Sequence, residues 1–168
     1  MKTSSTIQQK SESNTEIKDT KDTYRLVRLP PEQISKDWKS IYEAIKVSLP
    51  PVAQENNEKT EGNVNRALLN GSLECWVLVK GESEECILCT VSLGVDLISR
   101  ERNMFLYTIY GYKPVYFNVL YLLFDGLKRY AKSIGCTTFI AYTSNKRILA
   151  LVKALNWNTD FNLIHTEV

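Results

Sequence analysis

A predicted strand and a predicted helix meet at residues 111–115 through a very short loop. The start of a helix exposes backbone N–H groups, and many α/β proteins bind a phosphate at such a place. Loops of that kind are usually rich in glycine, so that the backbone can approach the ligand closely. This loop reads Gly111-Tyr112-Lys113-Pro114-Val115, with one glycine, one bulky aromatic and a proline that has no N–H. The position therefore suits an anion, whereas the residue types at it do not.

Cysteine and histidine offer little further chemistry. Cys86 and Cys89 have the spacing of a metal or redox pair, but they lie inside a strand pattern, where positions three apart face opposite sides. His165 is the only histidine of the chain and lies in the predicted last strand. A zinc site needs more nitrogen or sulfur ligands than this pattern brings together. We expect core thiols and no metal site.

Aromatic residues are unusually frequent around the loop. Tyr110, Tyr112, Phe117 and Tyr121 need not all face the core, and a surplus of aromatic side chains is typical of protein interfaces. Two interpretations remain open, an interaction surface at these four residues or simple packing. The basic residues of the last two helices favour a solvated helix face: Lys128, Arg129, Lys132, Lys146, Arg147 and Lys153.

The composition indicates a folded domain with a small net charge and therefore a weak electrostatic field. The chain has 168 residues, 43% of them hydrophobic and 24% charged, which is enough for one globular core. The net charge of +2 gives no pull on nucleic acid, and no apolar run reaches the ~20 residues of a membrane span. No signal peptide is evident, and the four cysteines suit a reducing compartment. We expect a cytoplasmic protein without a membrane partner.

The polar composition of residues 1–22 predicts a flexible arm. We expect residues 23–168 to form a single domain. Hydrophobic periodicity separates the domain into elements. The long helix has a buried stripe at Tyr116, Leu120, Leu123, Leu127, Tyr130 and Ile134, ends at Gly135, and is followed by Ser144 or Asn145 as the cap of the next helix. The expected strands are 24–29, 74–80, 86–98, 104–110, 137–142 and 160–168, and the expected helices run from Ser35 to Leu49, 64–69, 115–134 and from 145 to Leu155.

The predicted order β-α-α-β-β-β-α-β-α-β is a mixed α+β sheet with helices on its faces. It resembles the fold of the GNAT (Gcn5-related) acyltransferases from Tyr24 to the C-terminus. Two segments carry the resemblance: "VNRALLNGSLECWVLVKG" is similar to an opening found in small GNAT-like proteins of tailed bacteriophages, and "GLKRYAKSIGCTTFIAYTSNKRILALVKALNW" is similar to the second half of the fold.

The functional positions of the family match only in part. The resemblance implies a Gln/Arg-x-x-Gly-x-Gly/Ala loop for the coenzyme A pyrophosphate, to which "GYKPVYFN" does not align. It also implies a final helix beginning at Asn145, where Trp157 fits, but Val152 stands where a tyrosine would protonate the leaving thiolate. The strand 104–110 has no carboxylate for a general base, and Asp96 and Glu101 beside it read as surface residues.

These mismatches predict a catalytically degenerate GNAT-like protein with no cofactor. We expect it to act as a structural, assembly or interaction component, with protein partners contacting the arm, in the cytoplasm or, if phage-encoded, in a virion. The alternative is a divergent coenzyme A-dependent N-acetyltransferase. In that interpretation acetyl-CoA is held by Val115, Tyr116, Phe117 and Asn145, with Tyr116 or Tyr142 as the substitute acid.

Overall fold

The structure is a computed structural model that describes residues 15–18, 23–50, 57–143 and 145–160. None of the helices in these ranges is long and apolar enough to cross a membrane. The strands are β1 (Thr15–Lys18), β2 (Thr23–Arg28), β3 (Leu73–Lys80), β4 (Glu84–Val95), β5 (Arg102–Gly111) and β6 (Cys136–Ala141). The helices are α1 (Pro31–Lys36), α2 (Trp38–Lys46), α3 (Asn57–Leu69), α4 (Phe117–Ser133) and α5 (Lys146–Ala154).

The six strands form one sheet in the order β1-β2-β3-β4-β5-β6. Neighbours from β1 to β5 are antiparallel, and β5 and β6 are parallel. A parallel pair needs a crossover connection, which α4 supplies. The mixed α+β sheet predicted from the sequence is therefore confirmed.

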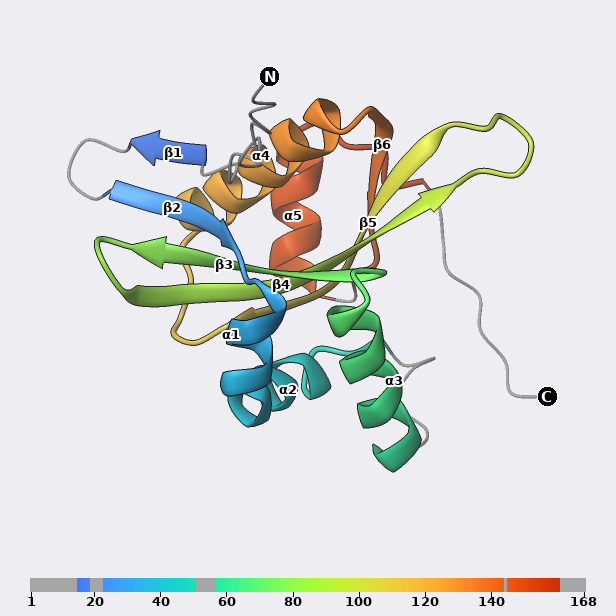
Figure 1. Cartoon of the computed structure of the whole chain (residues 1–168). Coiled ribbons are helices and arrows are strands. Elements are labelled where there is room, and N and C mark those ends of the chain that lie inside the picture. The colour runs from blue at the N-terminus through green and yellow to red at the C-terminus, as the bar shows by residue number, and fades with distance from the viewer. Residues whose placement is uncertain (1–14, 19–22, 51–56, 144, 161–168) are drawn as a thin grey trace, which may run out of the picture.

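Helices cover both faces of the sheet (Figure 1): α1, α2 and α3 lie on one side, and α4 and α5 lie on the other. Each side has its own buried cluster of hydrophobic residues. Strand β3 is buried on both faces from Leu73 to Leu78, because it lies between the two helical layers. The core thus holds β3, β4 and the first part of β5 rigidly in the middle of the molecule.

Several element boundaries differ from the prediction. Pro31 begins α1 instead of only ending a strand, since proline fits the first position of a helix. The single helix expected from Ser35 is interrupted at Asp37, so that α1 and α2 are separate. Helix α3 begins at Asn57, well before the predicted residue 64, because its polar first half needs no buried face. Strand β1 lies within the segment predicted to be a flexible arm.

Helix α4 carries the predicted buried stripe, with Leu120, Leu123 and Leu127 all buried. Tyr116 does not belong to it. That residue precedes the helix with an extended backbone, and its side chain is 76% exposed. Gly135 ends the segment with φ +79°, as predicted, and Asn145 caps α5. The predicted strand 160–168, with His165, lies outside the described residues beyond Asp160, as does most of the predicted arm.

Candidate active site

Strands β5 and β6 part in the middle of β5. Strand β6 pairs with β5 only from Arg102 to Leu106, whereas β4 pairs with β5 as far as Gly111. Thr90 lies opposite Thr108 and Val91 lies opposite Leu106, so Tyr107 is an extra residue in β5. An extra residue of this kind is a β-bulge, which bends its strand and redirects the side chains after it. The bulge therefore lies where β6 stops pairing with β5. Beyond it, β6 leaves the edge of β5 that faced it unpaired.

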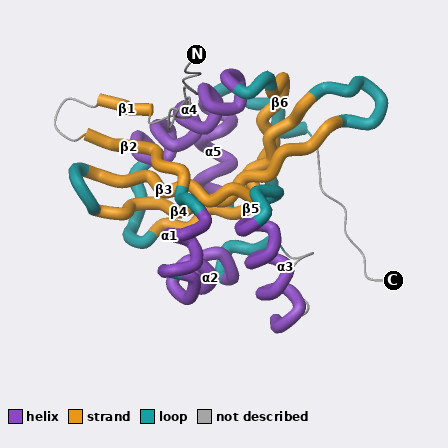
Figure 2. The backbone as a smooth tube through the Cα atoms, viewed as in Figure 1, coloured by secondary structure: helices purple, strands orange, loops and turns teal. Residues whose placement is uncertain are grey.

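A pocket of about 150 Å³ lies beyond this point. Its walls come from the ends of β4 and β5 and from the starts of α4 and α5, and most of them are apolar. The lining residues are Ile87, Ile109, Gly111, Val115, Leu120, Asn145, Arg147 and Ile148. Figure 2 shows the loop that connects β5 to α4, and Gly111 and Val115 at its two ends are among the lining residues. The geometry suits an extended ligand with an apolar part and a polar end.

The loop turns tightly at Gly111. A Cβ atom there would lie 2.8 Å from Val115 Cγ2 and 3.1 Å from the Lys113 carbonyl oxygen, so only glycine fits. The N–H of Tyr112 donates to the Cys86 carbonyl at 3.1 Å and so extends the ladder between β4 and β5. The glycine is thus required by the close approach of the loop to itself.

Tyr112, the aromatic residue of the loop, does not lie over the start of α4. The Tyr112 ring turns to the α1–α3 side and packs edge-on against Tyr110, with 5.3 Å between ring centroids. Burial, together with the nearby Glu85 carboxylate, raises the pKa of Tyr112 well above its usual value. Tyr116 and Phe117 are 76% and 48% exposed. The Tyr112 ring is therefore kept away from the start of α4 by its packing on the α1–α3 side.

The start of α4 also has backbone donors without a partner in the helix. No side chain caps its N-terminus at Tyr116, and the first N–H groups of a helix have no partner within the helix. Pro114 does remove one donor from the preceding loop, as the sequence indicates. The N–H groups of Phe117 and Asn118 remain as donors with the partial positive charge of the helix end, whereas the Val119 N–H already donates to the Tyr116 carbonyl oxygen at 3.1 Å.

The start of α5 faces the same pocket. The Asn145 carboxamide oxygen accepts hydrogen bonds from the N–H groups of Arg147 (2.9 Å) and Ile148 (3.4 Å). Arg147 Nη2 donates to the Val115 carbonyl oxygen at 3.2 Å, and its guanidinium lies 5.6 Å from the centre of the Phe117 ring. The sequence predicts Arg147 only as part of a solvated face. No sequence signal pairs it with Val115, 32 positions away.

The four residues of the predicted interaction surface lie in two separate pairs. Tyr110 and Tyr112 are half-buried against the α1–α3 core, while Phe117 and Tyr121 are about half exposed on α4. Tyr142, the alternative acid, is 51% exposed and directly follows β6. Val152 is buried, which agrees with a packing role at that position.

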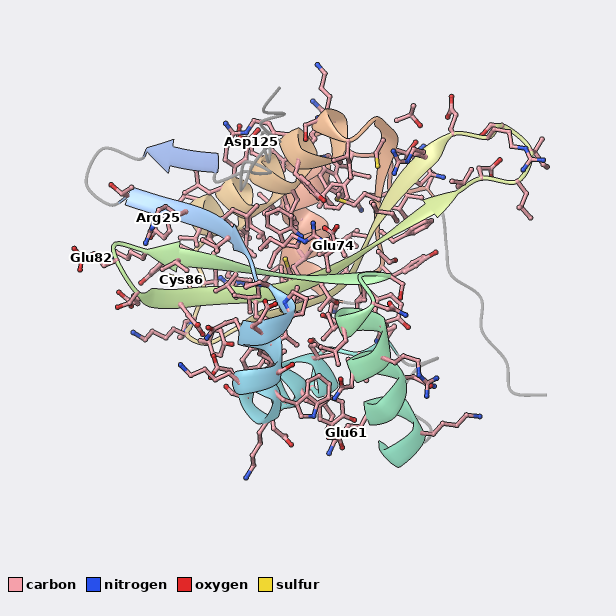
Figure 3. All side chains as sticks on the ribbon, in the orientation of Figure 1. Arg25, Glu61, Glu74, Glu82, Cys86 and Asp125 are labelled. Carbon is pink, nitrogen blue, oxygen red and sulfur yellow. The ribbon has the colours of Figure 1, made fainter. Side chains whose placement is uncertain are left out.

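None of the described residues that line the pocket is acidic. Asp96 instead accepts hydrogen bonds from Ser99 and Ile98 in the turn between β4 and β5, and these bonds lower its pKa. The buried carboxylate of Glu74, labelled in Figure 3, lies between β3 and α4. It accepts from Trp76 Nε1 and the Tyr130 hydroxyl, both at 3.0 Å, and pairs with Arg28 at 3.1 Å. Its oxygens are therefore committed to the core.

The cysteines contribute no ligand set. Cys89 is buried and Cys86 is half-buried, and burial raises the pKa of both thiols. Within the described ranges, no three His, Cys, Asp or Glu side chains come close enough together to hold a metal ion.

Comparisons with known proteins add the following. No family model and no curated protein matches the sequence. Solved structures do match in shape. A probable acetyltransferase has a TM-score of 0.66 at 13% identity, and the match covers 86% of this chain and 97% of that one. A ribosomal-protein-alanine N-acetyltransferase from Brucella melitensis biovar Abortus 2308 has a TM-score of 0.64 at 8% identity, covering 86% and 99%.

A third similar structure contains the coenzyme. It is the aminoglycoside N-acetyltransferase AAC(6')-Iy in complex with CoA, with a TM-score of 0.63 at 12% identity, covering 90% of this chain and 99% of that one. At such identities the comparisons establish the fold, and the predicted GNAT-like fold is confirmed.

The predicted function needs correction. The expectation of a degenerate structural or assembly component is wrong, because the similar structures are of proteins named as acetyltransferases. Nothing in them supports a bacteriophage or virion assignment. The loop at residues 111–115 lacks the glycines of a typical phosphate loop, as the sequence indicates. The tertiary structure keeps an uncapped helix start, an unpaired strand edge and an open pocket at the same place.

Proposed function

We propose that this chain is a coenzyme A-dependent N-acyltransferase that uses acetyl-CoA. The observation that carries the proposal is the parting of β5 and β6 at the Tyr107 bulge, directly beside the pocket and the start of α4. The likeness in fold to acetyltransferases, one of them with CoA bound, supports it.

The residues present fit such a cofactor. The edge of β5 beyond Leu106 offers backbone N–H and C=O groups to an amide-bearing chain, much as a sheet edge binds an added strand. The pocket offers apolar walls, and the N–H groups at Phe117 and Asn118 favour a phosphate. Val115, Tyr116, Phe117 and Asn145 are the residues that we propose for contact with acetyl-CoA.

Acetyl-CoA, when bound, supplies an acetyl group activated as a thioester, which an amine attacks as the thiol leaves. The chain has to position the two reactants and provide a proton for the departing sulfur. We assign the proton to the phenol of Tyr116 or Tyr142: both side chains are exposed, Tyr116 directly follows the pocket residue Val115, and Tyr142 directly follows β6. The amine enters as its free base, since no described pocket residue carries a carboxylate to deprotonate it, and the proton that its nitrogen loses on forming the amide restores the phenol.

The test combines binding and turnover. Acetyl-CoA is titrated into the protein by calorimetry, and release of free thiol is followed with a panel of primary amines. Ile148→Trp places a large side chain in the pocket and should abolish both signals, whereas Ala150→Trp on the exposed side of the same helix should preserve them. Melting curves for both variants show whether each is folded. A wild-type chain that neither binds acetyl-CoA nor acetylates any amine refutes the proposal.

The proton donor is tested separately. Tyr116→Phe and Tyr142→Phe each remove one hydroxyl and little else. The variant that lacks the donor should lose about 10²–10⁴-fold in kcat with little change in acetyl-CoA affinity. Equal activity in both variants and the wild type would contradict the assignment while leaving the acyltransferase proposal intact.

A further inference from the structure

Two exposed aromatic rings flank the start of α4 next to the pocket. Phe117 and Tyr121 are 48% and 46% exposed. They stand four positions apart on one helix, which brings their Cβ atoms to about 5–6 Å of each other on the same face. Leu120 and Phe124, between and beyond them, turn inward to the core. The first two turns of α4 therefore present an aromatic surface to solvent at the edge of the pocket.

Arg147 is fixed beside this surface by two contacts from another helix. Its Nη2 donates to the Val115 carbonyl oxygen, and its guanidinium lies over one face of the Phe117 ring. No carboxylate among the described residues pairs with it. A guanidinium has five N–H donors, so most of them stay available to an anion. Arg147 also lines the pocket, which links the charge to the apolar cavity.

We infer that Phe117 and Tyr121 stack the adenine ring of coenzyme A and that Arg147 binds a phosphate of the same nucleotide. This inference rests on the proposed function. The surface offers the aromatic rings first, then the guanidinium, then the apolar pocket. Coenzyme A has its base, its phosphates and its acyl-bearing arm in the same order. We assign phosphate binding to a side chain because Pro114, which has no N–H, leaves the loop with fewer backbone donors than a glycine-rich loop has.

The choice of a nucleotide over a protein partner follows from charge and size. A protein interface of ordinary stability buries about 800 Å² on each side, and two half-exposed rings supply only a small part of that area. Arg147, with which no described carboxylate forms an ion pair, lies over the Phe117 ring and keeps donors for an anion. Stacking of a base on an aromatic side chain needs only one ring face, and arginine next to it suits a phosphate.

The experiment compares coenzyme A with pantetheine, which lacks the nucleotide. Calorimetry for coenzyme A and ligand-observed NMR for pantetheine are carried out on wild type, Phe117→Ala, Tyr121→Ala and Arg147→Gln. Each variant should bind coenzyme A about tenfold more weakly, or about 1.4 kcal/mol, and should bind pantetheine as wild type does. Arg147→Gln should also flatten the dependence of coenzyme A affinity on salt, because an ion pair is lost.

Two controls match these substitutions. Ile98→Ala removes an apolar side chain that is 94% exposed on the turn between β4 and β5, and Lys132→Gln removes a charge from the last turn of α4. Both should bind coenzyme A as wild type does.

The possible outcomes separate the two proposals. Unchanged coenzyme A affinity in Phe117→Ala and Tyr121→Ala overturns the inference, and the surface then belongs to a different partner. Equal weakening of coenzyme A and pantetheine also overturns it, because the residues then only shape the pocket. If wild type transfers acetyl groups and these variants bind normally, only the inference fails. If wild type binds neither probe, the proposed function fails with it.

Discussion

Replacing Gly111 by alanine tests whether the loop before α4 must keep its present course. The new Cβ would lie 2.8 Å from Val115 Cγ2, about 0.7 Å short of the ~3.5 Å at which carbon atoms make ordinary contact. It would also lie 3.1 Å from the Lys113 carbonyl oxygen, which belongs to the backbone and yields less easily. The loop therefore has to move by several tenths of an ångström.

That movement should lower the free energy of unfolding, and it should also weaken the binding of acetyl-CoA. Overpacking of this kind destabilises a protein by about 1–3 kcal/mol. Val115 and Gly111 both line the pocket, so the shift changes the site directly. A displacement approaching 1 Å in a positioning element costs up to about a hundredfold in rate. We expect Gly111→Ala to weaken acetyl-CoA binding at least tenfold while the protein remains folded at 25 °C.

The assay is calorimetry with acetyl-CoA beside urea unfolding on the same samples. A second variant sharpens it. Val115→Ala in the Gly111→Ala background removes the nearer of the two contacts and leaves the one with Lys113. It should recover part of the stability, whereas its affinity for acetyl-CoA should stay below that of wild type, because Val115 is itself one of the proposed contacts. If Gly111→Ala binds acetyl-CoA as tightly as wild type, the loop does not form the site and the reasoning from its geometry is refuted.

Three further predictions concern the core, each measured by urea unfolding. Leu123→Ala should cost about 2–5 kcal/mol, because Leu123 is fully buried on α4, and a loss below 1 kcal/mol would mean that the site collapses freely. Glu74→Leu should cost about 1–3 kcal/mol by leaving the buried Trp76 N–H without an acceptor. Glu74→Gln keeps an acceptor and should cost less, so equal losses in the two variants would contradict this account. Burial raises the pKa of Cys75 to about 12 and that of Cys89 well above its usual value. The unfolded chain releases these protons first as the pH rises past about 9, so stability should fall by roughly 1.4 kcal/mol per pH unit for each thiol. Cys75→Ala should reduce that slope, and an unchanged slope would exclude Cys75 as a source of it.

Hydrophobic periodicity predicts the elements of this fold whose apolar residues all face the same side of the core. The α4 stripe through Leu120, Leu123 and Leu127 is visible in the sequence because each turn of the helix meets the same core. The stop at Gly135 and the cap at Asn145 are local chemistry, and the sequence predicts them as well. These elements fix the order of the fold, which is why the resemblance to the GNAT acyltransferase fold is visible although the family's loop motif does not align.

Boundaries without a buried face are not predictable in this way. The first half of α3 is polar, and its apolar pattern begins only near Val64. Strand β1 lies in a polar segment, and its pairing with β2 is a tertiary contact that no local pattern encodes. Expectations about residues 1–14 and about protein partners stay predictions, since those residues lie outside the described ranges.

The sequence predicts the loop and the helix start of the candidate site, but not the parting of β5 and β6, because that feature depends on one extra residue in a strand. The run from Met104 to Tyr110 alternates well enough to read as a regular strand, and nothing in it marks Tyr107 as unpaired. Yet that residue separates the half of β5 that pairs with β6 from the half that does not. An unpaired strand edge consists of backbone groups, which every residue type supplies. Glycines in the loop improve the approach of a phosphate, but their absence removes neither that edge nor the N–H groups at Phe117. A missing motif is therefore weak evidence against a site that is built mostly from backbone, and the course of β5 is the stronger evidence for one.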